Sequence, residues 1–555
     1  MRNSLIIFLL LCVNVLHGWS LDKPIHPSLE EYTYQREHVG EGIGSLPDGL
    51  WPLPRQMTSS GDTITVNPTT FRISSSSSGS ILQDAISRYM KYLFPIPTQN
   101  GTSSVSKLEV TLNLPYNENL TLSTDESYDL TLSKTAFTLK ANTVFGALRG
   151  LETFSQLVTF NYNSYEYSAK LVTISDRPRL SYRGVMIDTA RRFMTVSSLK
   201  GLIDQMSFYK LNSLHLHLID TDSWPLEVPG YPLLTQKGAY SKQAHTYSVS
   251  DVKDLVSYAL HRGVKIIPEI DTPGHSYSIC YAYPDLCVEY ESNGKLSRGV
   301  LPDPSNEKTW EFFDSMWSYV ASVFPSDQVG IGFDETDLSQ WQKSPAVQAL
   351  MKQKGFTQVS QVLGYYCERL LTILAKYNKK ALGWYPGLPS LTPISKYPNL
   401  AYDTWDGWIP NTQWQPAFKD LTSKGGHVIL SGPYYVVDPR RENIQKSYTW
   451  QQMYATNPTD FSGTASEQAL VLGGQLTVFD DAAITDSGNI ITKITPYLGA
   501  VGETWWSDPQ SLDMTRFAAQ RCRTIMRGVP SNPQAGGDIH NYHCLKEYEF
   551  PGLKY

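Results

Sequence analysis

The chain has 555 residues, of which 41% are hydrophobic and 18% charged, with 47 Lys and Arg against 53 Asp and Glu. This composition excludes a disordered chain and a long coiled coil, and a net charge of −6 without a basic block argues against nucleic acid as a partner. The aromatic content of 12% suits a flat-faced ligand such as a sugar, although a large core alone would also explain it.

Residues 1–20 are typical of a secretory signal peptide. Arg2 gives a positive start, residues 5–16 form an apolar run, and Gly18 and Ser20 are small residues suited to cleavage. The run is too short to span a bilayer, and no later segment has the length of a transmembrane helix. We therefore expect a mature protein that enters the secretory pathway and has no transmembrane anchor.

Residues 21–180 are expected to form a smaller α+β domain. Short β-rich runs alternate with turns, and helical patterns cover residues 81–94 and 144–160. Two Asn-x-Thr sequons, at Asn100 and Asn119, mark exposed glycosylation positions. We find no residue pattern in this domain that indicates chemistry.

Between about residues 181 and 530, short apolar strands alternate with amphipathic helices. The expected strands cover residues 184–188, 213–220, 265–271, 329–335, 381–385, 400–405, 427–432 and 471–479. Residues 199–206 have helical spacing, and a later helix can be capped by Ser250 and closed by Gly263. Eight alternations predict an α/β fold, a (β/α)8 TIM barrel preceded by the smaller domain. A doubly wound open sheet is the rival, but no Gly-rich phosphate loop follows the first strand.

Polar and aromatic residues recur where these strands end. They are Asp188, Arg191, Asp220, Asp271, His275, Asp334, Glu335, Trp384, Trp405, Tyr434, Tyr435, Phe479 and Asp481. Active sites of TIM barrels gather at the C-terminal ends of the strands. This distribution is the strongest indication from the residues alone that the chain is an enzyme.

The adjacent pair Asp334–Glu335 is the centre of the predicted site. Two carboxylates among Trp and Tyr side chains favour a glycosidase over a protease or phosphatase, because one can protonate the glycosidic oxygen while the other stabilises a cationic transition state. Carboxylates on neighbouring residues diverge and cannot easily flank one sugar ring. We therefore expect Glu335 to be the acid and Asp334 to support a nucleophile carried by the substrate, the 2-acetamido oxygen. In isolation, such a pair is more often a helix start or a solvated turn.

Several segments carry a family resemblance: YRGVMIDTARRF, KLNSLHLHLID, GVKIIPEIDTPGHS, GFDET, VILSGPYY and AVGETWWS. In this order, over about residues 181–530, they resemble glycoside hydrolase family 20, the β-N-acetylhexosaminidases. The resemblance implies exo-acting hydrolysis of terminal β-linked GlcNAc or GalNAc from glycoconjugates, by a retaining, substrate-assisted mechanism without a cofactor. Lysosomal members fit the signal peptide and the sequons, so we expect a lysosomal or secreted glycoprotein. Because members often dimerise, a homodimer is compatible with the resemblance.

The resemblance also assigns roles to the polar residues of the site. Glu335 matches the general acid/base, and Asp334 matches the residue that orients and charges the acetamido group. Asp220 and His275 resemble the pair that tunes the pKa of the acid, which must lie near the working pH. Arg191 matches the arginine that binds the sugar hydroxyls.

The remaining site residues are expected to contact the substrate. Trp384, Trp405 and Phe479 match the box around the acetamido methyl, although the two tryptophans could instead be core residues. Tyr435 matches the tyrosine that donates to the acetamido oxygen, and Asp481 stands where the family uses a glutamate for the 4- and 6-hydroxyls.

The sequence departs from the family pattern at Phe333, Thr221, Arg192, Phe479, Asp481, Gln475 and Val437. Phe333 is the most unexpected, because it places a bulky residue beside the acid. These departures motivate the alternative of a weakly active or non-catalytic sugar-binding glycoprotein. A glycosidase with an ordinary enzyme nucleophile is a third reading. A metal site at His215 and His217 is disfavoured, because the family needs none.

Loss of the signal peptide leaves five cysteines. Cys280–Cys287 and Cys522–Cys544 are expected disulfides, because each closes a short loop in an oxidising compartment. The second would tie the C-terminal tail, residues 531–555, to the barrel. Cys367 is expected to be a buried free thiol, and no pair has zinc-ligand spacing.

Overall fold

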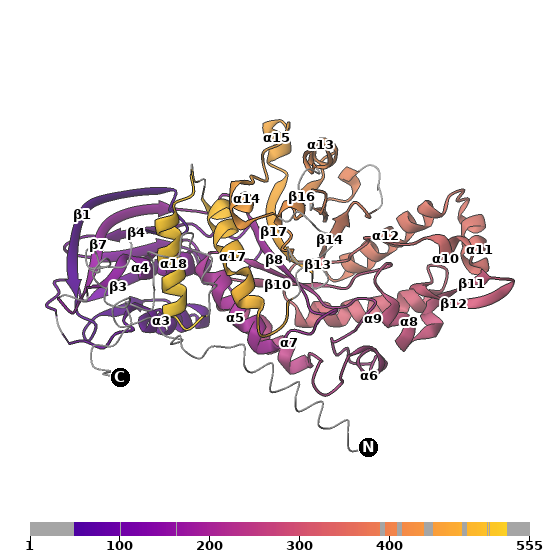
Figure 1. The fold of residues 1–555 in the computed structure, drawn as a ribbon, viewed down its shortest axis with the longest axis horizontal. Coiled ribbons are helices and arrows are strands. Elements are labelled where there is room, and N and C mark those ends of the chain that lie inside the picture. Colours follow the sequence, from indigo (N-terminus) through magenta and orange to yellow (C-terminus); the bar gives the residue numbers. More distant parts are fainter. Residues whose placement is uncertain are drawn as a thin grey trace, which may run out of the picture.

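The computed structural model describes residues 49–99, 101–161, 164–388, 394–407, 413–437, 448–479, 485–507, 509 and 511–529. Figure 1 shows the N-terminal domain packed beside a barrel. The expected signal peptide (1–20), Asn100, Asp481, Cys544 and the tail (531–555) lie outside these residues, so the predictions that concern them stay predictions.

The N-terminal domain is a seven-stranded sheet covered by two helices. The strands are β1 (Gln56–Val66), β2 (Arg72–Ser75), β3 (Lys107–Leu112), β4 (Tyr128–Leu132), β5 (Phe137–Ala141), β6 (Val158–Asn161) and β7 (Glu166–Asp176), in the order β1-β7-β4-β5-β3-β2 with β6 on β7. The helices are α3 (Ser80–Leu93) and α4 (Val144–Leu157). The helix expected over 144–160 therefore ends at Leu157, because the next four residues pair with β7.

Helix α4 has no solvent-exposed face. All fourteen of its residues are buried, since it lies in the core that the sheet shares with the barrel residue Trp506. Its start is capped by Thr143, whose side chain accepts a hydrogen bond from the backbone N–H of Gly146.

Eight parallel strands close into a barrel, which confirms the predicted TIM-barrel fold. They are β8 (Tyr182–Asp188), β9 (Ser213–His217), β10 (Lys265–Glu269), β13 (Gln328–Gly330), β14 (Lys380–Tyr385), β15 (Leu400–Thr404), β16 (His427–Leu430) and β17 (Val471–Val478). Each of the eight predicted strands overlaps one of these, but the strand expected over 329–335 ends already at Gly330. Their register places all C-terminal ends at one rim of the barrel.

Helices and one hairpin connect the strands. The helices are α5 (Val196–Phe208), α6 (Leu233–Gly238), α7 (Val249–Leu260), α8 (Tyr277–Ala282), η1 (Pro284–Leu286), α9 (Glu307–Val323), α10 (Ser339–Gln342), α11 (Pro345–Lys354), α12 (Val359–Lys376), η2 (Ile394–Lys396), α13 (Gln415–Ser423), η3 (Gly432–Tyr434), α14 (Trp450–Ala455), α15 (Ala465–Gln468), α17 (Ile490–Trp506) and α18 (Met514–Met526). The hairpin is β11 (Cys287–Ser292) and β12 (Lys295–Pro302). The cap expected at Ser250 is instead Ser248, which forms a capping box with Asp251, so Ser250 lies inside α7. Gly263 follows the helix with φ +67°, as expected for a closing residue.

A buried ionic network joins the two domains at the N-terminal end of the barrel. Glu126 lies 2.8 Å from the Arg149 Nε and 2.6 Å from an Arg183 Nη. Burial raises the pKa of Glu126, but the two guanidinium groups outweigh it and lower the pKa to about 2. Nearby, the Lys210 ammonium lies 3.0 Å from the Asp176 carboxylate.

The cysteines follow the expectations as far as the described residues reach. Cys280 and Cys287 form a disulfide between α8 and the start of β11, and Cys367 is a buried free thiol. Cys522 is disulfide-bonded, but Cys544 lies outside the described residues, so that pairing stays a prediction. Within the described residues, no helix combines the length and apolarity required to cross a membrane.

Candidate active site

Arg191 is held at the C-terminal rim of the barrel, just after β8. Its guanidinium lies 3.0 Å from Asp188 Oδ2 and 2.7 Å from Asp220 Oδ2, and its carbon lies 5.3 Å from the centre of the Phe479 ring. Two carboxylates and one aromatic face therefore fix the arginine, while its side chain keeps 19% of its surface exposed. This is the placement expected of a group that binds a polar ligand.

One imidazole contacts both members of the predicted catalytic pair. His275 Nε2 lies 3.6 Å from Asp334 Oδ2 and 3.5 Å from Glu335 Oε2, and its Nδ1 lies 3.4 Å from Asp220 Oδ2. The Asp334 side chain is 16% exposed, whereas the Glu335 side chain is 66% exposed. The structure thus brings the four predicted catalytic residues together and gives the two carboxylates different access to solvent.

The backbone of the loop that carries Asp334 and Glu335 is left-handed at several positions. Gly332, Phe333 and Glu335 have φ of +73°, +80° and +48°. A Cβ on Gly332 would lie 1.6 Å from Asp271 Oδ1, so only glycine fits there. At Phe333 and Glu335 the conformation costs about 1–2 kcal/mol each, and such strain is concentrated at functional sites.

Phe333 does not crowd the acid as its bulk suggests. Its ring is fully buried in the core, 6.0 Å from the ring of Tyr366, and its backbone N–H donates to Asp271 Oδ1 over 3.3 Å. The side chain therefore points away from the rim, which removes the main objection to an active site.

Asp334 of the pair and its neighbour Asp271 both have raised pKa values. Burial raises the pKa of Asp271 well above its usual range, and the nearby Asp334 and Glu269 carboxylates raise it further. Burial also raises the pKa of Asp334, while His275 opposes the shift. Polar atoms of Asp271, His275 and Asp334 all lie within 4.8 Å of one another. Burial and the two neighbouring carboxylates therefore favour the protonated form of Asp271.

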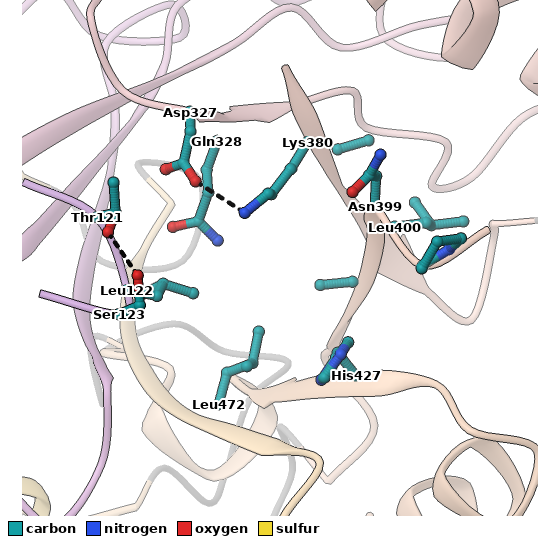
Figure 2. A pocket seen from close by; sticks show the side chains of 13 residues that line it. Thr121, Leu122, Ser123, Asp327, Gln328, Lys380, Asn399, Leu400, His427 and Leu472 are labelled. Atoms are coloured by element: carbon teal, nitrogen blue, oxygen red, sulfur yellow. Dashed lines mark hydrogen bonds and ion pairs between the residues drawn. The ribbon is translucent and has the colours of Figure 1, made fainter. Parts of the chain in front are cut away.

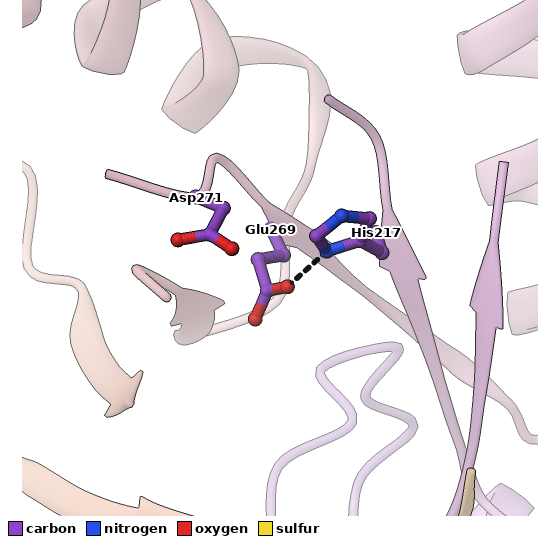
Figure 3. A group of neighbouring side chains, drawn as sticks. All are labelled: His217, Glu269 and Asp271. Carbon is purple, nitrogen blue, oxygen red and sulfur yellow. Dashed lines mark hydrogen bonds and ion pairs between the residues drawn. The ribbon is translucent and has the colours of Figure 1, made fainter. Parts of the chain in front are cut away.

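His217 and Glu269 lie next to Asp271 in the barrel interior (Figure 3). His217 Nδ1 lies 2.5 Å from Glu269 Oε1, and its Nε2 lies 3.0 Å from Asp220 Oδ2. Burial lowers the pKa of His217, but the hydrogen bonds to Asp220 and Glu269 outweigh it and raise the pKa to about 10. With both ring nitrogens engaged in this way, His217 has no lone pair to offer, so its cluster with Glu269 and Asp271 does not fit a metal ion.

Gln475, where the family pattern has a glutamate, is also buried in the barrel interior. Its Nε2 donates to Asp403 Oδ2 over 2.7 Å, and its Oε1 accepts from the Tyr182 hydroxyl over 2.6 Å. Burial raises the pKa of Asp403 to about 7. The amide supplies a donor that an ionised glutamate would lack, so the change fits its neighbours.

An apolar box stands beside Arg191 at the rim. It consists of Met186, Trp384, Tyr435, Val437 and Phe479, with Trp405 packed against it. The Phe479 ring centre lies 5.8 Å from that of Trp384 and 6.0 Å from that of Tyr435. Trp405 is held by its Nε1, which donates to the Pro386 carbonyl over 2.9 Å. Phe479 and Val437, two departures from the family pattern, are therefore both members of the box.

Thr221 and Arg192, two further departures from the family pattern, are exposed, as is the sequon residue Asn119. The backbone N–H of Thr221 donates to Asp220 Oδ1, so this residue adjoins the site. Asp481 is outside the described residues. The sequence reasoning missed Glu269, Gln475 and Asp403 as parts of the site. Their only signal is that inward-facing positions of otherwise apolar strands carry polar side chains.

Comparisons with known proteins agree across most of the chain. The family model described as "Glycosyl hydrolase family 20, catalytic domain" matches residues 180–509, and one described as "beta-acetyl hexosaminidase like" matches residues 50–157. The β-hexosaminidase subunit alpha of Rattus norvegicus is 31% identical over 531 residues, covering 92% of this chain and 98% of the relative. The subunit beta of Homo sapiens is 32% identical over 510 residues, covering 88% and 89%.

Solved structures share the fold. The Flavobacterium johnsoniae chitobiase superposes with a TM-score of 0.73 at 24% identity, over 86% of this chain and 72% of the other. The exo β-N-acetylglucosaminidase of Vibrio harveyi, in complex with N-acetylglucosamine, has a TM-score of 0.71 at 24% identity, over 88% and 79%.

Proposed function

The chain belongs to glycosyl hydrolase family 20 and is a glycoside hydrolase, and from this premise we propose how it acts. It is an exo-acting β-N-acetylhexosaminidase that removes terminal, non-reducing GlcNAc or GalNAc from glycoconjugates with retention of configuration. The contact of one imidazole with both Asp334 and Glu335 carries this proposal, because it places an acid and a second carboxylate at one point of the rim.

Glu335 acts as the general acid. Its exposed carboxyl can reach the glycosidic oxygen of a sugar seated in the box, and donates its proton as the bond between C1 and that oxygen breaks. His275 Nε2 lies 3.5 Å from this carboxyl group. In the second half of the reaction the carboxylate takes a proton from the water that attacks C1.

Asp334 supports the nucleophile that the substrate carries. The acetamido oxygen forms a bond to C1 as the leaving group departs, which places positive charge on the acetamido nitrogen. An ionised Asp334 orients the N–H and stabilises that charge, while the Tyr435 hydroxyl donates to the acetamido oxygen. Attack by water then reopens the ring, and two inversions at C1 give net retention.

The box and the arginine select the substrate. Trp384, Trp405 and Phe479 surround the acetamido methyl with apolar surface, and Arg191 binds the ring hydroxyls. Because Phe479 is smaller than a tryptophan, we expect this wall to leave more room beside the methyl. Asp481 is proposed to bind the 4- and 6-hydroxyls.

The test is hydrolysis of an aryl β-N-acetylglucosaminide by the purified protein between pH 4 and 7, beside the matching β-glucoside. Cleavage of the first alone is expected, because the glucoside has no acetamido nucleophile. Equal cleavage of both would point to an ordinary enzyme nucleophile. Cleavage of neither by a folded protein would favour a sugar-binding glycoprotein instead.

We also propose that the protein enters the secretory pathway and is lysosomal or secreted, as residues 1–20 and the two sequons suggest. A homodimer is proposed from the family resemblance alone. Recovery of the protein from the culture medium tests entry into the secretory pathway. Light scattering on the same preparation measures its mass and tests the homodimer.

A further inference from the structure

A cavity of about 310 Å³ lies at the end of the barrel opposite to the catalytic pair (Figure 2). Its wall includes residues at the starts of five consecutive strands, namely Gln328, Lys380, Leu400, His427 and Leu472. The loop 121–123 of the N-terminal domain closes one side. Because the strands are parallel, their starts and their C-terminal ends lie at opposite rims, so this cavity is separate from the active site.

Polar groups of the cavity wall carry unused hydrogen-bonding capacity. Gln328 is 3% exposed, yet its Oε1 has no hydrogen-bond partner among the described residues, and the same holds for Asp327 Oδ1 and His427 Nδ1. In Figure 2 the Gln328 amide and the His427 ring both point into the cavity. A buried polar atom left unpaired costs about 1–3 kcal/mol, so a ligand with hydroxyl donors would be stabilised here.

The charges and the apolar surface of the cavity wall favour a neutral ligand that carries both hydroxyl and C–H groups. Lys380 is already paired with Asp327, its Nζ lying 3.1 Å from Oδ2, so the wall offers no free cation to attract an anion. Leu122 and Leu472 pack against the barrel core and form apolar surface beside the acceptors. Hydroxyls on one edge and C–H groups on a face are the combination that a sugar ring presents. The volume, at the lower end of small-molecule sites, suits one such ring.

We propose that this cavity is a second saccharide-binding site, which holds one neutral sugar unit through Gln328, Asp327 and His427. The sugar can come from two sources. Thr121, in the cavity wall, is the threonine of the sequon that begins at Asn119, and two residues of extended chain span at most about 7 Å. A glycan on the exposed Asn119 could therefore reach the cavity, as could a free saccharide from solution.

The experiment uses the full-length protein with isotope-labelled histidines, and methyl α-D-mannoside as the probe. The mannoside lacks an acetamido group and is not a substrate of the proposed reaction, so it is not consumed during the measurement. The His427 resonance, identified with His427→Phe, reports on the cavity alone. We expect the probe to shift this resonance, and Gln328→Leu to weaken the binding about two- to tenfold, as one lost hydrogen bond predicts. Gln353→Leu, at an exposed position of α11, is the matched control.

A comparison of the glycosylated protein with Asn119→Gln distinguishes the two sources. A shift in both forms identifies a free saccharide as the ligand. A shift only in Asn119→Gln shows that the chain's own glycan occupies the cavity. The proposal is overturned when the probe leaves the His427 resonance unchanged in both forms, or when Gln328→Leu, folded by circular dichroism, binds as well as the control.

Discussion

The two ends of the barrel handle buried charge in opposite ways. At the N-terminal end, Glu126 meets two guanidinium groups, and its pKa falls to about 2. At the C-terminal end, Asp271 lies near other carboxylates, and both burial and these neighbours raise its pKa. The first arrangement stabilises the fold, whereas the second stores protons and strain where chemistry takes place. The comparison teaches that the neighbouring charges, and not burial alone, set the direction in which the pKa of a buried carboxyl group moves. Asp220, also at the C-terminal end, is held by His217 and Arg191, and its pKa is lowered like that of Glu126.

The largest effect is expected from Glu335→Gln, which removes the acid but leaves an amide of the same shape. Turnover of the aryl N-acetylglucosaminide should fall by about 10²- to 10⁴-fold, the usual contribution of general acid catalysis. The unfolding midpoint should not change, because the side chain is mostly exposed. Steady-state kinetics and thermal unfolding check both, with the exposed Glu311→Gln as the control. An unchanged rate would contradict the assignment of Glu335 as the general acid.

At the other end, Glu126→Gln should destabilise the protein by about 3–5 kcal/mol, because it leaves two buried guanidinium groups without their counter-charge. The activity of the folded fraction should be retained. The folded pKa is about 2 and the usual value is 4.5, so the stabilisation is present above about pH 4.5 and is lost as the pH falls towards 2. Urea unfolding should therefore show a smaller difference in the free energy of unfolding between the parent protein and Glu126→Gln at pH 3 than at pH 7.

The matched control for that change is Glu109→Gln, in an exposed pair with Lys107. Exposed pairs contribute about 0–1 kcal/mol, so little change is expected. Equal effects of Glu126→Gln and Glu109→Gln would remove the distinction between the two ends of the barrel.

Phe333→Gly separates the strain of the loop that carries Asp334 and Glu335 from the packing beneath it. Loss of a buried phenyl ring costs about 3–5 kcal/mol, and relief of the left-handed backbone returns about 1–2 kcal/mol, so we expect a net loss of about 2 kcal/mol. The specific activity should stay close to that of the parent, because the ring points into the core. Phe333→Leu, which retains the backbone strain, is the comparison variant. A large loss of kcat without loss of stability would show that the ring acts on the site.

The smallest effect is expected from Asp271→Asn, whose sign depends on pH. The pKa of Asp271 is higher in the folded protein than in the unfolded chain. Raising the pH above the unfolded value therefore destabilises the native protein. An amide does not ionise, so the substitution removes the cost of burying the charged carboxylate. It should stabilise the fold by about 0.5–2 kcal/mol at pH 7 and by almost nothing at pH 3.5. Urea unfolding at pH 7 and at pH 3.5 checks both values. Asp129→Asn, on the exposed face of β4, should show no pH-dependent difference.

The barrel could be predicted from the sequence because each of its strands is a short apolar run between turn and helix signals. The candidate site at the rim could be predicted from position, because polar residues such as Asp220 and His275 lie in the loops that follow the strands. The helix cap at Ser248 was missed because two serines compete within three residues, and only the backbone decides which one receives the N–H of Asp251.

What the sequence could not provide is the direction of side chains. The ring of Phe333 enters the core only because φ is positive at that residue, and one sequence does not report φ. The buried group of Glu269, Gln475 and Asp403 comes from strands far apart in the chain, so no local pattern connects its members. The cavity behind Gln328 depends on how two domains meet, which no segment of either domain specifies alone.

The complete burial of α4 has a consequence for dissecting the protein. Helix α4 has no face suited to solvent. Separating the barrel from the N-terminal domain would therefore expose apolar residues on both, including Trp506 of the barrel. A barrel expressed as residues 181–530 should therefore aggregate, and limited proteolysis between the domains should yield fragments that stay associated. The catalytic unit is the pair of domains, and its evolution or redesign has to carry both together.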